Sequence, residues 1–226
     1  MGRRILTSPP CVSVVLCTYN RAALLPRAVR SVLAQTTPAW QLVIVDDGST
    51  DDTANVVETF RRGDDRIVVV RQKNRGLAAA RNVGIRVAEG THVAFLDSDD
   101  EYAPDHLAWR MRYLERRPAI DMVYGGLIVR GPREKQYVVD LEHPHRKIHV
   151  SRCYVGGTFM VRREVLQKVG GFRPIAFGED FDLVRRIERR FRVEKVGRRS
   201  YIYYCDTADR LCDLHTQRLL QKSPAP

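Results

Sequence analysis

The chain of 226 residues contains no apolar run that approaches the roughly 18 uninterrupted residues required by a membrane-spanning helix. Its first residues, MGRRILTSPPCVSVVL, show no small-residue cleavage site after an apolar stretch, so we expect no secretory signal peptide. Cysteine is scarce: the five cysteines are an odd number without Cys-x-x-Cys spacing, which predicts neither a disulfide framework nor a zinc site. We therefore expect a cytoplasmic protein.

A glycine-rich phosphate loop is also missing. The segment CTYNR at 17–21 follows the first apolar run and contains no glycine, whereas dinucleotide-binding oxidoreductases carry GxGxxG at this point. This absence argues against a hydride-transfer enzyme.

Acidic residues are too few to balance the basic ones. The chain has 38 Lys and Arg against 27 Asp and Glu, a net charge of +11, with much of the excess in RRIERRFRVEKVGRR at 185–199. A nucleoside diphosphate, a phospholipid surface or nucleic acid would suit this excess. A solvated basic helix face explains most of the individual arginines equally well.

The first half of the chain alternates between two kinds of segment. Four short, continuous β-branched runs are typical of parallel strands covered on both faces, and the segments between them have helical spacing. The expected strands are 12–17, 41–46, 66–71 and 92–97, and the expected helices are 24–35, 53–62 and 76–90. This alternation predicts βαβ units in an open α/β sheet.

The second half is less regular. We expect a helix from Pro104 to Pro118, a strand in 121–131, a polar and irregular mobile flap at 131–152, and a further helix in GEDFDLVRRIERR. The whole reads as a single α/β domain with a Rossmann-like, mostly parallel central sheet and a small additional antiparallel sheet. Its expected parts are an extension (1–10), the domain (11–205, divided into halves 11–100 and 101–205) and a tail (206–226).

Polar residues follow the expected strands where each strand ends. In open α/β sheets ligands bind outside the carboxyl ends of the strands, so these stretches should meet at one crevice. They are CTYNR, DDGSTDDT, the QKNRG loop and DSDD.

Two aspartates in DSDD stand at alternate positions. Asp97 and Asp99 can turn toward one hard cation, and Mg²⁺ or Mn²⁺ prefers such oxygen ligands together with substrate phosphate. Acids that favour the positive end of the next helix are an equally good explanation of the motif taken alone. We interpret Asp100 and Glu101 as helix-entry charges of this kind, before Pro104.

The stretch DDGSTDDT has an ordinary turn in its centre. Gly48 turns the chain, and Thr50 or Asp51 caps the following helix. Asp46 and Asp47 are not explained in this way, because two like charges at the end of an apolar strand repel each other unless a donor satisfies them. A nucleobase imide N–H is a suitable donor.

Six motifs in this order resemble a family 2 glycosyltransferase of the GT-A fold over about residues 11–190. They are CTYNR, IVDDGSTDDT, NRGLAAARNVGI, FLDSDD, GGTFMVRREVLQKVGGF and GEDFDLVRR. The resemblance implies an inverting, metal-dependent transfer of a sugar from a nucleotide-sugar, with UDP as the expected nucleotide, to an acceptor hydroxyl. It implies Mn²⁺ or Mg²⁺ as cofactor, a glycan, lipid-linked or other hydroxyl acceptor, and no nucleic acid. The basic helix suggests peripheral binding to an anionic membrane at its inner face, and a homodimer is one conceivable assembly.

The resemblance also assigns roles to matching residues. Thr18, Tyr19 and Asn20 would pack against the base, Asp47 would accept from its imide, Asp97 would face the ribose, and Asp99 would bind the metal. The nucleotide-sugar side as a whole comprises Thr18, Tyr19, Asn20, Asp47, Asn74, Arg81, Asp97 and Ser98. Asp180 would be the catalytic base. Gly156, Gly157 and Glu179 would lie on the acceptor side.

Four of these residues have ordinary structural alternatives. Glu179 and Asp180 also suit a helix start, and Gly156 and Gly157 also suit a tight strand turn. We interpret Asp182 as structural.

The chain departs from the family pattern after the base-bearing helix. Many relatives carry a histidine near the metal there, whereas YIYYCDTADR offers Asp206, so Asp97 and Asp206 are candidates for further metal ligands beside Asp99. The short remainder of the chain disfavours a processive synthase.

Two aromatic or histidine-rich features have simpler explanations. The histidines of HPHRKIH (His143, His145 and His149) suggest a solvated basic loop, and the pair Trp109 and Tyr113 suggests core packing.

Two other functions are the alternatives. A sugar-phosphate nucleotidyltransferase also uses paired carboxylates and magnesium but needs a glycine-rich, basic first loop. A catalytically silent nucleotide-sugar-binding partner at a membrane would have less reason to keep Asp99 and Asp180 together.

Overall fold

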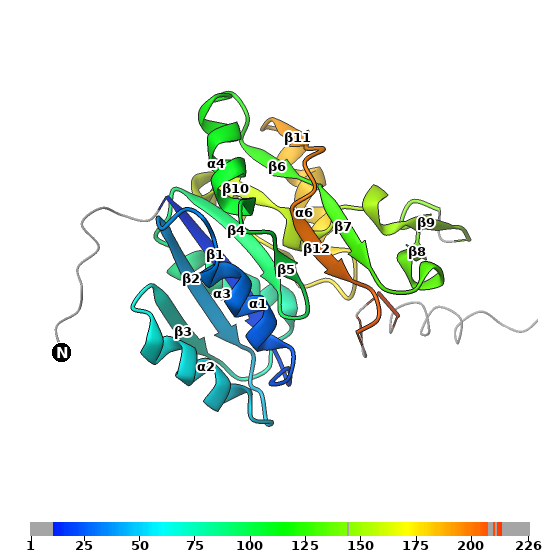
Figure 1. The fold of residues 1–226 in the computed structure, drawn as a ribbon. Helices are drawn as coiled ribbons and strands as arrows, with labels where there is room; N and C mark the ends of the chain where they lie inside the picture. Colours follow the sequence, from blue (N-terminus) through cyan, green and yellow to red (C-terminus); the bar gives the residue numbers. More distant parts are fainter. Residues whose placement is uncertain (1–10, 144, 208–209, 211, 214–226) are drawn as a thin grey trace, which may run out of the picture.

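The computed structural model describes residues 11–143, 145–207, 210 and 212–213. Its main sheet has seven strands in the order β11-β6-β10-β4-β1-β2-β3 (Figure 1). The elements of the first half are β1 (Val12–Thr18), α1 (Leu25–Leu33), β2 (Trp40–Asp46), α2 (Thr53–Gly63), β3 (Ile67–Arg71), α3 (Leu77–Val87) and β4 (His92–Asp97). Strand β1 pairs in parallel with β2 and β4, and β2 pairs in parallel with β3. The predicted βαβ units are confirmed.

The second half adds the other side of the sheet. Its elements are β5 (Glu101–Tyr102), α4 (His106–Glu115), β6 (Met122–Tyr124), β7 (Leu127–Arg130), β10 (Met160–Arg162), α5 (Arg163–Val169), α6 (Glu179–Glu188), β11 (Val193–Lys195) and β12 (Tyr201–Tyr204). Strand β10 runs antiparallel to β4 and β6, and β11 runs parallel to β6. A second sheet has the order β5-β12-β7, in which β12 is antiparallel to β5 and parallel to β7.

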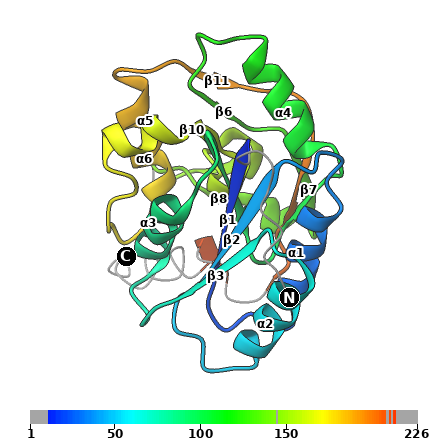
Figure 2. The same ribbon diagram turned by 90° about the vertical axis from the view of Figure 1, so that its left-hand side faces the viewer.

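Helices cover both faces of the main sheet. Alternate residues of β1 point to opposite faces: Val14 and Leu16 pack with α1, α2 and α4, and Val15 packs with α3, α5 and α6. Figure 2 shows these two helix layers on either side of the strands. The continuous apolar runs of the central strands therefore have the two-sided burial that their composition predicts.

Segment 131–152 is more regular than its polar composition suggested. It contains two short 3₁₀ turns and an antiparallel hairpin formed by β8 (Tyr137–Val139) and β9 (Lys147–His149). The hairpin corrects the expectation of an irregular flap: its two paired runs have only three residues each, too few for a clear periodic signal.

Three smaller predictions can be checked here. Trp109 and Tyr113 are partly buried against the core, with ring centroids 5.0 Å apart, as predicted. His149 shares hydrogen bonds with Gln136 and Ser151 in the hairpin. None of the helices in the described part of the chain combines the length and apolarity needed to cross a membrane.

Candidate active site

A cavity of about 860 Å³ opens at the carboxyl ends of β1, β2 and β4. Both halves of the domain line it, as the sheet topology predicted. Most of the residues assigned from sequence are among its walls: Thr18, Tyr19, Asn20, Asp47, Asn74, Arg81, Asp97, Ser98, Asp99, Glu179 and Asp180. Gly156, Gly157 and Asp206 do not line it.

The buried guanidinium of Arg81, on α3, lies at the centre of the site. Its Nη1 is 2.7 Å from Oδ1 of Asp180 and 3.4 Å from Oε1 of Glu179, and its Nη2 is 3.1 Å from Oδ1 of Asp97. The side chain is only 4% exposed. One cation thus joins the end of β4 to the start of α6, a role beyond the nucleotide-side position that the sequence suggested for Arg81.

Asp180 lies in the first turn of α6, after Gly178 has turned the chain with a φ of +86°. Its Oδ2 accepts a hydrogen bond from the backbone N–H of Gly156 at 2.7 Å. Burial raises the pKa of Asp180 to about 7, against the lowering effect of Arg81 and with a further rise from Glu179 and Asp97. A carboxyl group with this pKa can exchange a proton near neutral pH.

The glycine pair at 156–157 stands behind the cavity wall. A Cβ on Gly156 would lie 2.5 Å from Oδ1 of Asp180, and one on Gly157 would lie 2.0 Å from the hydroxyl oxygen of Tyr201. Both glycines form a 3₁₀ turn that allows Asp180 and Tyr201 to approach the backbone closely, and their expected place on the acceptor side stays a prediction.

The acidic run after β4 separates into two groups. Asp97, Asp99 and Asp100 all line the cavity, but Asp100 is only 1% exposed and accepts hydrogen bonds from the Tyr201 hydroxyl at 2.7 Å and the Tyr204 N–H at 2.8 Å. Glu101 lies in β5 and accepts from the Tyr204 hydroxyl at 2.7 Å.

The interpretation of Asp100 and Glu101 as helix-entry charges is therefore wrong. The chain enters the second sheet through β5 before α4 begins, so β12 donates to both acids. The residue before α4 is Asp105.

Asp97 and Asp99 are the best candidates for holding a metal ion. Burial, and secondly the charge of Asp97, raise the pKa of Asp99, so a cation between the two carboxylates would relieve this crowding. Asp206 is exposed and lies beside Gly131, outside the cavity lining, which does not support it as a further ligand. Across the described residues no group of three His, Cys, Asp or Glu side chains is placed to hold an ion. The pair fits Mg²⁺ or Mn²⁺ only if substrate and water supply the remaining oxygens.

The carboxylate of Asp47 is satisfied by the chain itself. It accepts from Nε2 of Gln72 at 2.6 Å, from the Arg75 N–H at 2.9 Å and from the Gly76 N–H at 2.8 Å. Asp46 likewise accepts from a backbone N–H at 2.9 Å. A bound donor is therefore not required to offset the charge of Asp47, because the β3–α3 loop crosses the end of β2. The second oxygen of Asp46, Oδ2, accepts no hydrogen bond within the described residues and lies 3.4 Å from Nε of Arg71.

Asn20 joins the β1–α1 loop to the β2–α2 loop at the wall of the cavity. Its Oδ1 accepts from the Thr50 N–H at 2.8 Å, and its own N–H donates to the Ser49 hydroxyl at 2.9 Å. Asn20 has a φ of +50°, a conformation that asparagine tolerates better than most residues. The Asp51 carboxylate accepts from the Thr53 N–H at 3.0 Å, but the N-cap of α2 is Asp52, which makes no side-chain cap bond, so the cap predicted at Thr50 or Asp51 is wrong by at least one position.

The family model for glycosyl transferase family 2 matches residues 13–170. The chain belongs to glycosyltransferase family 2. TuaG of Bacillus subtilis, provisionally named for teichuronic acid biosynthesis, is 41% identical over 48% of this chain and 43% of TuaG. A PGL/p-HBAD biosynthesis glycosyltransferase of Mycobacterium bovis is 36% identical over 54% of this chain and 48% of that protein. The matches therefore span less than half the length of either relative.

Solved glycosyltransferases share the GT-A fold of this family 2 domain. Staphylococcus aureus TarS (1–349), in complex with UDP-GlcNAc, has a TM-score of 0.73 at 22% identity, covering 88% of this chain and 60% of that 1–349 chain. The Pyrobaculum calidifontis mannosyltransferase PcManGT, in complex with GDP-Man and Mn²⁺, has a TM-score of 0.72 at 21% identity, covering 97% of this chain and 67% of that one. The predicted fold class is confirmed.

Sequence reasoning missed part of the family 2 domain's cavity. The hairpin and the segment after it contribute lining residues, among them Val138, Leu141 and Arg152, and Phe177 precedes α6. Each lies in a stretch without a motif or a long periodic run, so only the tertiary contact with α6 could reveal it.

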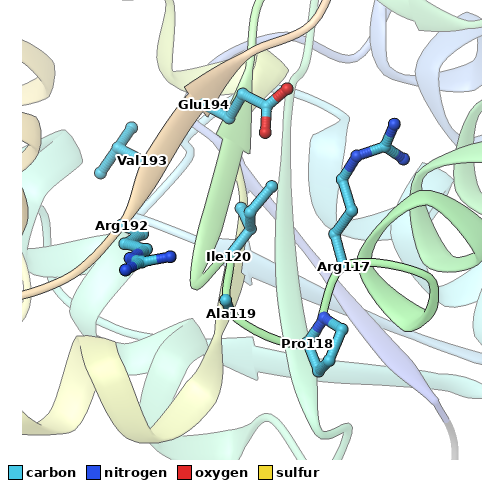
Figure 3. Close-up of a pocket in the computed structure, with 7 residues that line it drawn as sticks. All are labelled: Arg117, Pro118, Ala119, Ile120, Arg192, Val193 and Glu194. Carbon is cyan, nitrogen blue, oxygen red and sulfur yellow. The ribbon is translucent and has the colours of Figure 1, made fainter.

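A second hollow, of about 500 Å³, lies between the α4–β6 turn and β11 (Figure 3). Ile120 and Val193 form part of its lining, together with Arg117, Arg192 and Glu194. It lies at the amino ends of β6 and β11, whereas ligand sites of open α/β sheets form at carboxyl ends. The larger cavity is therefore the candidate active site.

Proposed function

We propose that this family 2 domain transfers a sugar from a nucleotide-sugar, with UDP as the expected nucleotide, to an acceptor hydroxyl with inversion. The observation that carries the proposal is the Arg81 cluster, which places Asp180 in the same cavity as Asp97 and Asp99. A candidate base and a candidate metal pair thereby share one space. The nucleotide-sugars held by TarS and PcManGT support the choice of donor class.

The donor would occupy the end of the cavity formed by the first half of the chain. Thr18, Tyr19 and Asn20 would pack against the base, and Tyr19 is 46% exposed and free to be covered. Asp47 would accept from the imide N–H with a lone pair that its three protein donors leave available. Asn74 and Ser98 would line the same side, with Asp97 near the ribose.

Asp99, with Asp97, would hold Mn²⁺ or Mg²⁺ on the donor diphosphate. When bound, the ion would neutralise the negative charge that develops on the departing nucleoside diphosphate. Asp99 itself would orient that end of the donor, leaving the anomeric carbon toward Asp180.

Asp180 would act as the base. It would accept the acceptor hydroxyl's proton while the hydroxyl oxygen attacks the anomeric carbon from the face opposite the diphosphate, which inverts that carbon. Arg81 and the Gly156 N–H would fix the carboxylate, and each carboxylate oxygen would keep a second lone pair for the proton.

Three matched substitutions test these roles. Asp182 provides the control, because it lies two residues from Asp180 on α6, pairs with Arg186 at 2.8 Å and does not line the cavity. The measurements are Mn²⁺-dependent binding of a panel of nucleotide-sugars by thermal shift, and release of free nucleotide by slow hydrolysis, in which water replaces the unknown acceptor.

We expect Asp180→Asn to lower nucleotide release by about 10²- to 10⁴-fold while nucleotide binding persists. Asp99→Asn should weaken Mn²⁺-dependent binding as well, and Asp182→Asn should leave both nearly unchanged. Equal loss of binding in the Asp99 and Asp180 variants would contradict the separate roles. Binding without any turnover would favour the silent binding protein instead.

We also infer peripheral association with an anionic membrane at the cytoplasmic face. Arg186 already has partners within the protein: it donates hydrogen bonds to Asp182 and to two backbone carbonyls. Arg189 and Arg190, at the end of α6, are exposed. Together with Arg185, which is also exposed, these two arginines are the residues of the basic helix that would meet anionic lipid.

A further inference from the structure

One row of polar side chains on α1 faces the chain that follows β4. Arg27 and Ser31 are four residues apart and so lie on the same face of the helix, and Gln35 continues this spacing just after the helix ends. The Ser31 hydroxyl accepts from the Tyr102 N–H at 3.1 Å, and Nε2 of Gln35 donates to the Ala103 carbonyl at 2.8 Å. The later part of the row therefore anchors β5 and the residue after it.

The first member of the row, Arg27, contacts a candidate metal ligand. Its Nη2 donates a hydrogen bond to the backbone carbonyl of Asp99, and its Nε lies 3.5 Å from Oε1 of Glu101. Its guanidinium carbon lies 3.7 Å from the centroid of the Tyr204 ring, and the Tyr204 hydroxyl donates to the same Glu101 oxygen at 2.7 Å. A carboxylate and an aromatic ring thus orient the guanidinium toward the Asp99 carbonyl.

The two candidate metal ligands are supported differently. Asp97 is the last residue of β4, where it is held in register opposite Cys17 of β1. Asp99 lies in the turn after the strand, so contacts outside the main sheet must fix its backbone. Groups that orient a metal ligand commonly change metal affinity by about 10- to 100-fold when they are removed. Arg27 is in the position of such a group, and it does not itself line the cavity.

We infer that Arg27 is a positioning residue for the metal-binding carboxylate of Asp99. This rests on the proposed function, in which Asp99 holds Mn²⁺ or Mg²⁺ on the donor diphosphate. Arg27 acts through the backbone of Asp99 and not on the ion. Its removal should therefore weaken metal binding and leave the contacts to the nucleobase in place.

Titration of Mn²⁺ in the presence of saturating UDP, with the free ion followed by electron paramagnetic resonance, tests this role without a turnover assay. Arg27→Met keeps the apolar stem but removes the guanidinium, and it should weaken Mn²⁺ binding about tenfold or more. UDP binding measured in EDTA should be unchanged. Arg27→Lys keeps a charge and a donor, so it should recover part of the Mn²⁺ affinity. Unaltered Mn²⁺ affinity in Arg27→Met would overturn the inference, as would an equal loss of UDP binding in EDTA.

Two variants separate positioning from a general loss of stability. Ser31→Ala removes the contact with Tyr102 one helical turn away, and it should lower the thermal unfolding midpoint without changing the Mn²⁺ affinity. Arg30→Met removes an exposed arginine from the same helix and should change neither quantity. If Ser31→Ala weakens Mn²⁺ binding as much as Arg27→Met does, the role of Arg27 is only structural and the inference is refuted.

Asp99→Asn separates the failure of this inference from the failure of the proposed function. If Asp99→Asn loses Mn²⁺ affinity while Arg27→Met keeps it, the proposed metal site stands and only the role of Arg27 is refuted. If Asp99→Asn binds Mn²⁺ as the unaltered protein does, Asp99 is not a ligand, and the proposed metal site fails together with the inference.

Discussion

Replacing Arg81 with glutamine removes the cation on which Asp97, Glu179 and Asp180 converge. Its guanidinium lies within 3.4 Å of an oxygen of each of these carboxylates. Glutamine keeps much of the side-chain length and a hydrogen-bonding end but carries no charge. The change therefore probes what the charge of Arg81 does to the candidate base.

The expected effect follows from the pKa of Asp180. A neighbouring cation lowers a carboxyl pKa by about 1–3 units, and the present pKa of about 7 already includes this lowering. Without Arg81 the pKa should rise to roughly 8–10. At neutral pH the ionised fraction of Asp180, and with it the turnover, should fall by about fivefold to five-hundredfold.

Stability should change with a definite sign. Asp180 has a folded-state pKa above its ordinary value, so its contribution to stability is fully present below about pH 4 and is lost as the pH rises toward 7. Because Arg81→Gln raises the pKa of Asp180 further, this loss of stability should continue to higher pH. Breaking a buried ion pair costs about 3–5 kcal/mol, and we expect the lower end because the three carboxylates are 14–28% exposed. The deficit should shrink at acid pH.

The assay is kcat/KM for nucleotide release, measured from about pH 5 to pH 10, with thermal unfolding measured on the same samples. Arg81→Lys is the matched control. Lysine keeps the positive charge but lacks the planar guanidinium that contacts Asp97 and Asp180 together, so the acid limb of the pH profile of kcat/KM should shift less than in Arg81→Gln. If Arg81→Gln lowers activity equally at every pH and the acid limb stays near pH 7, Arg81 does not tune the base.

Two further predictions concern packing and the basic surface. Gly157→Ala should lower the free energy of unfolding by about 1–3 kcal/mol in urea, because the fully buried Tyr201 leaves no room for a Cβ, whereas the uncrowded Gly63→Ala should not destabilise. Equal urea midpoints would contradict this. The double change Arg189→Glu with Arg190→Glu should weaken sedimentation with phosphatidylserine vesicles by about tenfold or more. Binding that does not respond to salt would contradict an electrostatic contact.

The first half of the fold could be predicted because its signals are local. Each strand from β1 to β4 is a continuous apolar run whose bounds differ from the predicted ones by one residue or less. Helices α1–α3 follow from spacing within single segments. The hairpin of β8 and β9 gave no such signal, because its strands are three residues long and its position depends on contact with the loop before α6.

The location of the site was predictable, but its internal pairing was not. Parallel strands deliver their carboxyl ends to one edge, so the cavity follows from the order of the elements. The bond from Arg81 to Asp180 joins residues 99 positions apart, and nothing in the sequence near either residue specifies the other. Asp47 shows the converse: its local charge suggested a missing donor, but the β3–α3 loop provides three.

The second sheet pairs with some of the acidic residues that follow β4. Residues 97–101 include four acids. If all four carboxylates faced a diphosphate without partners, they would repel it. Strand β12 provides hydrogen-bond donors for two of these acids. The Tyr201 hydroxyl and the Tyr204 N–H donate to Asp100, and the Tyr204 hydroxyl donates to Glu101. Asp97 and Asp99 line the cavity, and Arg81 pairs with Asp97. The small sheet therefore contributes to the charge at this end of the cavity, so a change of Tyr201, a β12 residue that does not line the cavity, should alter nucleotide binding through Asp100.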